Sequence, residues 1–191
     1  MTADQVLTVL EQSGALLNGH FELRSGLHSN RFFQCANVLR YPRRAAVLCD
    51  ELVRVYRDGI GAGVAIDTVI APAMGGLAVG HEVARALDVK SIFAEKQDGK
   101  LVLRRFAIER GERFIVAEDV ITRGGRVQET IDIVRGRGGV VAAVLCLVDR
   151  SAGQARFDVP MVSLLQLAPV TYDPKQCPLC TQGLALVHPG S

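Results

Sequence analysis

The chain has 191 residues, of which 49% are hydrophobic and 22% are charged. This is enough for one folded domain with a sizeable core. A formal net charge of +2 without a basic stripe argues against a nucleic-acid surface. The longest apolar stretches, such as 140–148, are too short to span a membrane, and no charged-then-apolar leader precedes the first expected helix. We therefore expect a cytoplasmic protein with neither a membrane nor a nucleic acid as partner.

Helical and strand patterns alternate along the chain. Thr2 and Gln5 form a capping box, which predicts a first helix to about Gln12. The next expected elements are short strands and turns over 19–40, a helix over 43–57, a buried strand over 64–71, a helix over 77–87 and a strand over 91–94. Residues 96–106, with Asp98-Gly99 at their centre, predict a hairpin or a mobile loop. A strand, turn and helix at 114–134 and strands at 140–148 and 161–167 complete the pattern. This alternation predicts a single α/β domain over 1–191, with a mainly parallel sheet flanked by helices.

The most informative segment is 113–126. An apolar run ends in Glu118 and Asp119, and a glycine-bearing turn at 122–126 leads into an amphipathic helix. Ligands of parallel sheets bind outside the carboxyl ends of the strands, and a glycine-rich turn at a helix N-terminus favours phosphate. Carboxylates repel phosphate but suit sugar hydroxyls, or the Mg²⁺ that accompanies a polyphosphate. The pattern predicts a phosphorylated sugar, with Glu118 and Asp119 on the ribose diol and 122–126 on the phosphate.

A purely structural interpretation of the same segment is an ordinary strand-turn-helix corner whose glycines allow a tight turn. Two other phosphate-binding classes do not fit the sequence. No G-x-x-x-x-G-K-[ST] is present, which argues against a Walker-type NTPase, and no G-x-G-x-x-G follows a strand, which argues against a dinucleotide-binding fold.

Residues 116–125 resemble the phosphoribosyl-pyrophosphate (PRPP) signature of the type I phosphoribosyltransferases. Other segments resemble the orotate phosphoribosyltransferases within that family: 21–33 resembles their base-binding hood, 72–85 their pyrophosphate loop and the helix behind it, and 148–150 the strand end whose arginine holds the orotate carboxylate. The tail, 177–191, is similar to that of one bacterial branch. The resemblance covers nearly the whole chain. It implies a twisted type I phosphoribosyltransferase sheet, with a core over about 41–164 and a small hood from about 15–40 and 165–191.

This resemblance also implies an activity and a set of site residues. The activity is transfer of the 5-phosphoribosyl group from PRPP to orotate, which gives orotidine 5′-monophosphate and pyrophosphate in de novo pyrimidine biosynthesis, with Mg²⁺ as cofactor and a homodimer as the assembly. The implied catalytic residues are Glu118, Asp119, Lys96 and Lys100. The implied PRPP-binding residues are Gly75, Gly76, Lys96, Glu118, Asp119, Val120, Ile121, Thr122, Arg123, Gly124, Gly125 and Arg126. The implied orotate-binding residues are Thr122, Arg150, Arg24, Phe32 and Phe33, with Arg150 forking onto the carboxylate.

The sequence departs from the family pattern in three places. The loop around Lys96 and Lys100 is short and has no histidine, and a glutamate precedes Lys96 where arginine is usual. Gly75 stands where the pyrophosphate loop often has a lysine. Arg123 and Arg126 stand where small or hydroxyl residues are usual, and Arg126 can either bind phosphate or lie in solvent.

Two alternative functions stay open at this point. One is a phosphoribosyltransferase for a purine base, although a purine has no carboxylate for Arg150. The other is a non-catalytic regulator that senses PRPP and binds nucleic acid. The near-neutral charge and the lack of a helix-turn-helix pattern count against the regulator.

Cys177 and Cys180 form a C-x-x-C motif, which is half of a zinc site. No second pair with ligand spacing is visible in the sequence, and His20, His28, His81 and His188 look isolated. We therefore expect a tight turn around Pro178, and the alternatives for Cys177 and Cys180 are a zinc ion shared across a dimer or a disulfide.

Overall fold

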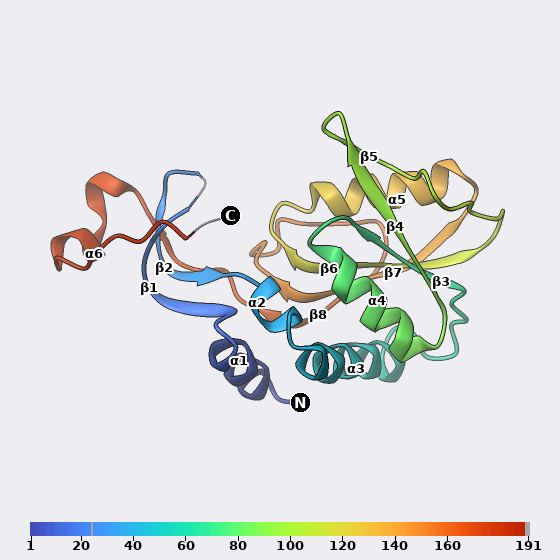
Figure 1. The fold of residues 1–191 in the computed structure, drawn as a ribbon, viewed down its shortest axis with the longest axis horizontal. Coiled ribbons are helices and arrows are strands. Elements are labelled where there is room, and N and C mark those ends of the chain that lie inside the picture. The colour runs from blue at the N-terminus through green and yellow to red at the C-terminus, as the bar shows by residue number, and fades with distance from the viewer. Residues whose placement is uncertain (24, 190–191) are drawn as a thin grey trace.

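The computed structural model describes residues 1–23 and 25–189. Its core is a six-stranded sheet in the order β5-β4-β3-β6-β7-β8 (Figure 1). These strands are β3 (Thr68–Pro72), β4 (Lys90–Gln97), β5 (Lys100–Val102), β6 (Arg113–Ile121), β7 (Val140–Asp149) and β8 (Met161–Gln166). All neighbours are parallel except β5, which runs antiparallel to β4. The expected α/β fold with a mainly parallel sheet is confirmed.

Helices cover both faces of this sheet (Figure 1). They are α1 (Ala3–Gln12), α2 (Ala36–Leu39), α3 (Pro42–Asp58), α4 (Gly76–Leu87) and α5 (Gly125–Gly136). The side chains of β6 alternate between the two layers, as the period of a strand requires. Ile115 and Ala117 pack into the cluster formed with α1, α3 and α4, whereas Phe114 and Val116 pack into the cluster formed with α5. All four are fully buried, so β6 is fixed at the centre of the core.

A second, smaller sheet joins the two ends of the chain. It contains β1 (Leu16–Glu22), β2 (His28–Phe33) and β9 (Thr171–Tyr172) in the order β1-β2-β9. The chain then forms a 3₁₀ turn, η1 (Pro174–Gln176), and the short helix α6 (Pro178–Thr181), before Val187 bridges to Phe21 on β1. We call β1, β2, β9 and 173–189 the hood, because they correspond to the hood that the sequence predicts from both chain ends.

The structure differs from the sequence expectation in several places. The short helix α2 replaces part of the strands and turns expected over 19–40, and β4 extends beyond 91–94 at both ends. β3 begins at Thr68 rather than at 64, because turns carry the chain from the end of α3 to Val64, whose N–H donates to the carbonyl of Gly61. β6 does not stop at Ala117 but continues through both carboxylates, since its pairing with β7 runs as far as Ile121 opposite Asp149. The backbone of both carboxylate residues is therefore held by the pairing of β6 with β7.

The segment after β4 is a hairpin, one of the two forms that its sequence predicts. Lys96 pairs with Leu101 across β4 and β5. At the turn, Asp98 has φ 48° and Gly99 has φ 85°. Positive φ at both central residues is the geometry favoured for two-residue hairpins, and Asp-Gly is a preferred sequence for it.

Within 1–23 and 25–189, no helix combines the length and the hydropathy needed to cross a bilayer.

Candidate active site

The ends of β3 and β6 bring a glycine pair against an acidic pair. A methyl group placed on Gly75 would lie 3.2 Å from Oδ1 of Asp119, and one on Gly76 would lie 3.1 Å from Oε1 of Glu118. Oδ1 of Asp119 accepts a hydrogen bond from the N–H of Val120 at 2.8 Å, which fixes the carboxylate against its own strand. The carboxylates and the expected pyrophosphate loop thus lie next to each other in space.

Two helices begin at this site with glycine. Gly75 precedes α4, and Gly124, with φ 75°, precedes α5. Among the described residues, neither helix has a side chain that caps its first N–H groups or an acidic residue in its first turn. By contrast, α1 begins with the full Thr2–Gln5 capping box. Uncapped N–H groups and the positive end of the helix dipole favour an anion, so the two helix starts have the properties of anion-binding positions.

Glu118 has an unusual protonation state. Its side chain is only 8% exposed, and burial, reinforced by the neighbouring charge of Asp119, raises its pKa from 4.5 to about 9. The carboxyl group therefore carries a proton at neutral pH in the ligand-free protein. A protonated carboxyl can both donate to and accept from a sugar hydroxyl.

The turn after β6 encloses a cavity of about 300 Å³. Its lining consists of Glu118, 120–127 and Glu129. Gly124 is required here for two reasons: its φ is positive, and a Cβ would lie 2.8 Å from the ring of Phe157. The turn that the sequence predicts to bind phosphate therefore lines a cavity at the start of α5.

The hairpin that carries Lys96 and Lys100 is tied to this turn. Nη1 of Arg126 donates to the carbonyl oxygen of Gly99 at 3.3 Å and to Oε2 of Glu129 at 3.0 Å. The same Oε2 accepts from the backbone N–H of Leu101 at 3.1 Å. The sequence left two roles open for Arg126, phosphate binding or exposure to solvent. The structure adds a third role, because these hydrogen bonds anchor the hairpin to α5.

Two arginines lie just beyond β5, the second strand of the hairpin. Arg104 and Arg105 line a cavity of about 510 Å³ together with Lys96 and Met74. Nε of Arg105 donates to Oε1 of Glu95 at 2.7 Å. Glu95, which replaces the usual arginine, is therefore neutralised by a basic residue from the opposite arm. No signal in the sequence identified this pair, because the contact depends on how the hairpin folds.

At the end of β7, Arg150 faces the hood. Its guanidinium carbon lies 5.2 Å from the centre of the Phe33 ring, and its buried Nε has no hydrogen-bond partner among the described residues. Burial lowers the pKa of this guanidinium from its ordinary value. An arginine nevertheless stays charged in proteins, so the orphaned donor points to an anionic ligand.

Arg150 and Thr122 share a cavity of about 270 Å³ with β9 and the segment before it. This cavity adjoins the phosphate turn, because Thr122 and Arg123 line both. The Phe32 ring packs within the hood instead, with its centre 5.8 Å from the centre of the Phe21 ring. The structure thus brings Thr122, Arg150 and Phe33 together, whereas Arg24 lies outside the described residues.

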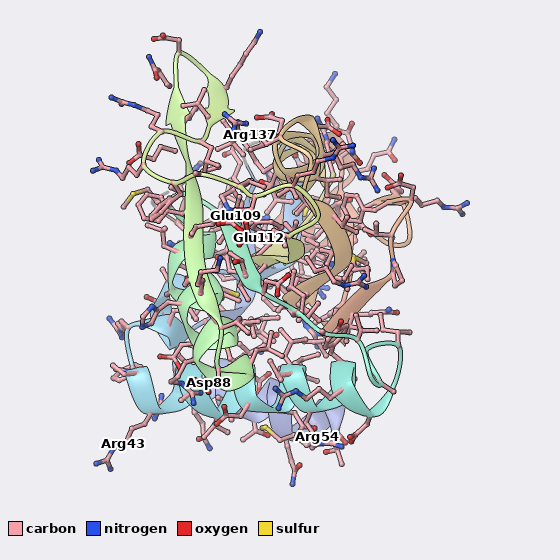
Figure 2. The ribbon with its side chains drawn as sticks, turned by 90° about the vertical axis from the view of Figure 1, so that its right-hand side faces the viewer. Arg43, Arg54, Asp88, Glu109, Glu112 and Arg137 are labelled. Atoms are coloured by element: carbon pink, nitrogen blue, oxygen red, sulfur yellow. The ribbon has the colours of Figure 1, made fainter. Side chains whose placement is uncertain are left out.

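A larger hollow lies away from this site. It measures about 850 Å³ and lies at the opposite edge of the sheet, where β3, β4 and β6 begin. Figure 2 shows Glu109 and Glu112 close together at this edge, with Asp88 below them. Oε1 of Glu112 accepts from Thr68 at 2.6 Å and from Lys90 at 2.5 Å. The Glu112 carboxylate thus links the first residues of β3 and β4. Ligands of parallel sheets bind at the other edge, where the strands end, so this hollow is not the candidate active site.

One sequence interpretation was wrong. His20 and His28 are not isolated, because their ring nitrogens and the sulfurs of Cys177 and Cys180 all lie within 4.8 Å of one another. The pairing of β1 with β2 brings the two histidines together, and the C-terminal segment then returns to the hood. Spacing along the sequence could not reveal a cluster whose halves are about 150 residues apart.

Comparison with known proteins agrees with this geometry. Residues 37–178 match the family described as "Phosphoribosyl transferase domain". Over 192 aligned residues, the chain is 48% identical to the orotate phosphoribosyltransferase of Desulforamulus reducens and 50% identical to that of Pelotomaculum thermopropionicum, covering all of this chain and 98% of each relative. The chain belongs to the orotate phosphoribosyltransferase family.

Solved structures place the family fold on the same elements. The orotate phosphoribosyltransferase of Aeropyrum pernix superposes with a TM-score of 0.71 at 30% identity, over 85% of this chain and 93% of that one. An adenine phosphoribosyltransferase from Rhodothermus marinus superposes with a TM-score of 0.63 at 22% identity. The second likeness concerns the fold alone, so the choice of base must be argued from the site.

Proposed function

We propose that this member of the orotate phosphoribosyltransferase family transfers the 5-phosphoribosyl group of PRPP to orotate, releasing pyrophosphate and forming orotidine 5′-monophosphate. The observation that carries the choice of orotate is Arg150. Its partly buried guanidinium has an unpaired Nε in a cavity that adjoins the phosphate turn. A planar pyrimidine that bears a carboxylate matches this donor and the neighbouring Phe33 ring.

Each of the two helix starts would bind a different anionic group of PRPP. The N-terminus of α5 and its turn would hold the 5-phosphate, and the N-terminus of α4 at Gly75 and Gly76 would hold the pyrophosphate. Glu118 and Asp119 lie at the junction, where they would hold the ribose hydroxyls. As the bond from C1 to pyrophosphate breaks, positive charge develops on the ribose, and Asp119 would stabilise it.

The hairpin supplies the positive charge that the glycine-rich pyrophosphate loop lacks. Lys96 and Lys100 are both exposed on it and would neutralise the leaving pyrophosphate. Arg105 lies beside Lys96 in the same cavity and is held by Glu95. Closure of the hairpin over the bound substrate would exclude water and so prevent hydrolysis of PRPP.

Mg²⁺ fits this set of donors. A protein binds Mg²⁺ through one or two carboxylates together with substrate phosphates, and Asp119 lies next to the proposed pyrophosphate position. Glu118 carries a proton in the free protein and is therefore the poorer ligand. Bound with PRPP, the ion would neutralise charge on the pyrophosphate, so we propose that the substrate carries most of its coordination.

Pyrophosphate release tests the proposal. The full-length protein with PRPP and Mg²⁺ is offered orotate, uracil, adenine, guanine, hypoxanthine and xanthine separately. Release is expected with orotate alone. Arg150→Ala should lower kcat/KM for orotate by roughly 10- to 150-fold, the range that loss of a hydrogen bond to a charged group gives, while the Kd for PRPP stays unchanged. Arg156→Ala, on the loop after β7, is the matched control and should behave as the unaltered protein.

Other results would overturn parts of this assignment. Pyrophosphate release with a purine would support the assignment of the PRPP site but would contradict the assignment of orotate as the base. PRPP binding without turnover on any base would favour the PRPP-sensing regulator. An unchanged KM for orotate in Arg150→Ala would contradict the proposed contact between Arg150 and the orotate carboxylate.

We also propose a homodimer in the cytoplasm, as the family resemblance implies. The exposed surface of the second and third helices supports an interface there. Val47 is 52% exposed and Tyr41 is 41% exposed, and Arg40 and Arg44 lie over the Tyr41 ring at 5.0 and 4.7 Å. Sedimentation at micromolar concentration should give twice the chain mass, and Val47→Asp should halve it. A monomeric unaltered protein would contradict the proposal.

A further inference from the structure

The C-terminal segment of the hood has almost no hydrophobic core of its own. Among residues 166–189, all of which the structure describes, Cys177 is the only buried one. Yet this segment is folded, with β9, η1 and α6 in sequence. Small units without a sufficient core usually need a disulfide or a metal ion to hold them. The position of the single buried residue, a cysteine, indicates where such a link would be.

Four side chains with metal-binding atoms meet at that cysteine. Sγ of Cys177 lies 3.5 Å from Nε2 of His20. Sγ of Cys180 lies 3.7 Å from the same nitrogen and 3.4 Å from Nδ1 of His28, and the two ring nitrogens are 2.9 Å apart. Two ligands come from the adjacent strands β1 and β2, and two come from the C-terminal segment.

These separations can be compared with those in a zinc site. Zinc lies about 2.3 Å from sulfur and about 2.0–2.1 Å from nitrogen, so tetrahedral geometry sets the sulfur and nitrogen atoms about 3.6 Å apart and two nitrogens about 3.3 Å apart. The three sulfur–nitrogen distances given above match this geometry, and the remaining pairs of ligand atoms lie within 4.8 Å of one another. The ring nitrogens of His20 and His28 would need to separate by only a few tenths of an ångström.

A second contact orients one of the ligands. Nδ1 of His20 lies 2.9 Å from the carbonyl oxygen of Leu184, so Nδ1 carries the hydrogen and Nε2 presents its lone pair to the cluster. Metal-binding histidines usually donate their other ring N–H to a carbonyl or a carboxylate in this way. His20, His28 and Cys177 are at most 5% exposed, whereas Cys180 is exposed and leaves a path by which an ion can enter.

We propose that His20, His28, Cys177 and Cys180 bind one Zn²⁺ ion that fastens the C-terminal segment to β1 and β2. Four protein ligands close the coordination sphere, so the ion is structural and takes no part in phosphoribosyl transfer. It also acts on the base site indirectly. β2 carries both His28 and Phe33, and Phe33 packs beside Arg150. Zinc therefore holds the strand that completes the proposed orotate pocket, while the phosphate turn lies on the core sheet.

Metal analysis of the full-length protein, produced without a polyhistidine tag in zinc-containing medium, tests the site. After dialysis, we expect one zinc ion per chain. Replacement of zinc by Co²⁺ should give the visible absorption of a tetrahedral ion and a thiolate charge-transfer band. Cys180→Ser, at the exposed position, should lose both signals without disturbing a buried side chain. Cys49→Ala and His188→Ala remove a cysteine and a histidine outside the cluster and should retain both.

Two further readouts separate this site from the active site. Chelation of zinc from the unaltered protein should lower its Tm and make 168–189 sensitive to protease, and Cys180→Ser should show both properties before chelation. The KM for orotate should rise several-fold in either case, while the Kd for PRPP stays unchanged. The zinc content, the cobalt spectrum, the Tm and the protease sensitivity do not depend on turnover, so loss of the zinc proposal and loss of the proposed function are distinguishable.

Several results would overturn the zinc site. A protein that holds no zinc and gives no cobalt thiolate band has no such site. If the intact mass is lower by two hydrogens, and Cys177 and Cys180 react with thiol reagents only after reduction, the two cysteines form a disulfide and the zinc proposal is wrong. Zinc that persists in both Cys180→Ser and His28→Ala would place the ion elsewhere.

Discussion

The guanidinium of Arg150 lies over the ring of Phe33, 5.2 Å from its centre, and this contact joins the two parts of the molecule. Arg150 follows β7 of the core sheet, and Phe33 ends β2 of the hood. The base pocket therefore depends on the position of the hood, whereas the phosphate turn belongs to the core alone. Changes in the hood should affect orotate more than PRPP.

Phe33→Leu tests this division. Loss of the cation–π contact, worth about 0.5–2 kcal/mol, should raise the KM for orotate roughly 2- to 30-fold with no change in the Kd for PRPP. Steady-state kinetics and PRPP titration measure the two effects. Phe32→Leu is the matched control, since Phe32 packs on Phe21. An equal rise in KM for both variants would contradict a specific role of Phe33.

The buried carboxyl of Glu118 should make the protein less stable as the pH rises. Its pKa is about 9 in the folded protein and about 4.5 when unfolded, so between these values the folded state binds the additional proton and unfolding releases it. Stability contributed by this group falls progressively over that range. Glu118→Gln should remove the slope and raise the Tm at pH 8, by roughly 2–4 °C for each kcal/mol gained, while PRPP turnover falls.

Thermal unfolding from pH 5 to pH 9 measures this effect. Glu11→Gln, at an exposed site on α1, is the control and should leave the pH profile unchanged. A Glu118→Gln protein with a lower Tm at pH 8 would show that the carboxyl is not protonated in the native state.

The hairpin lysines should matter for the rate and not for stability. Both are exposed, so Lys96→Ala and Lys100→Ala should leave the Tm within about 1 °C, because surface substitutions usually change stability by less than 0.5 kcal/mol. Loss of charge stabilisation at the leaving pyrophosphate should lower kcat by about 100-fold for Lys96. Lys175→Ala, in the hood, is the control. Full activity in both hairpin variants would assign the pyrophosphate to other residues, with Arg105 as the first candidate.

Arg126 should hold the hairpin against α5. Arg126→Ala removes the hydrogen bonds to Gly99 and Glu129, so the backbone of 97–102 should exchange its amide hydrogens faster in the free protein. Hydrogen exchange followed by mass spectrometry measures this change. Arg104→Ala, on the same segment but outside this network, should leave the exchange unchanged. Unchanged exchange in Arg126→Ala would mean that the β4–β5 pairing alone orders the hairpin.

The sequence predicted the fold and pointed to the PRPP half of the proposed site, because the signals for both are local. The apolar run into Glu118, the glycines at 124–125 and the capping box at Thr2 each determine the structure within a few residues of themselves. The Asp98-Gly99 turn is equally local. The extension of β6 through its carboxylates was missed, because it depends on pairing with a partner strand rather than on the apolar run.

Features made by distant segments were not predicted. The pairing of Arg105 with Glu95 depends on the register of the hairpin. The cluster of His20, His28, Cys177 and Cys180 depends on the return of the C-terminal segment to the hood. Each of these residues has an ordinary sequence context, so only three-dimensional proximity gives it a role.

The hood unites the two ends of the chain, and this sets an order of events during synthesis. When a ribosome has just released Asp149 and Arg150, β1 and β2 still lack β9 and the bridge from Val187 to Phe21. The phosphate turn and its flanking strands are already complete by then. The nascent chain should therefore gain the ability to bind PRPP before it gains a pocket for the base, and only the finished chain can join the two substrates.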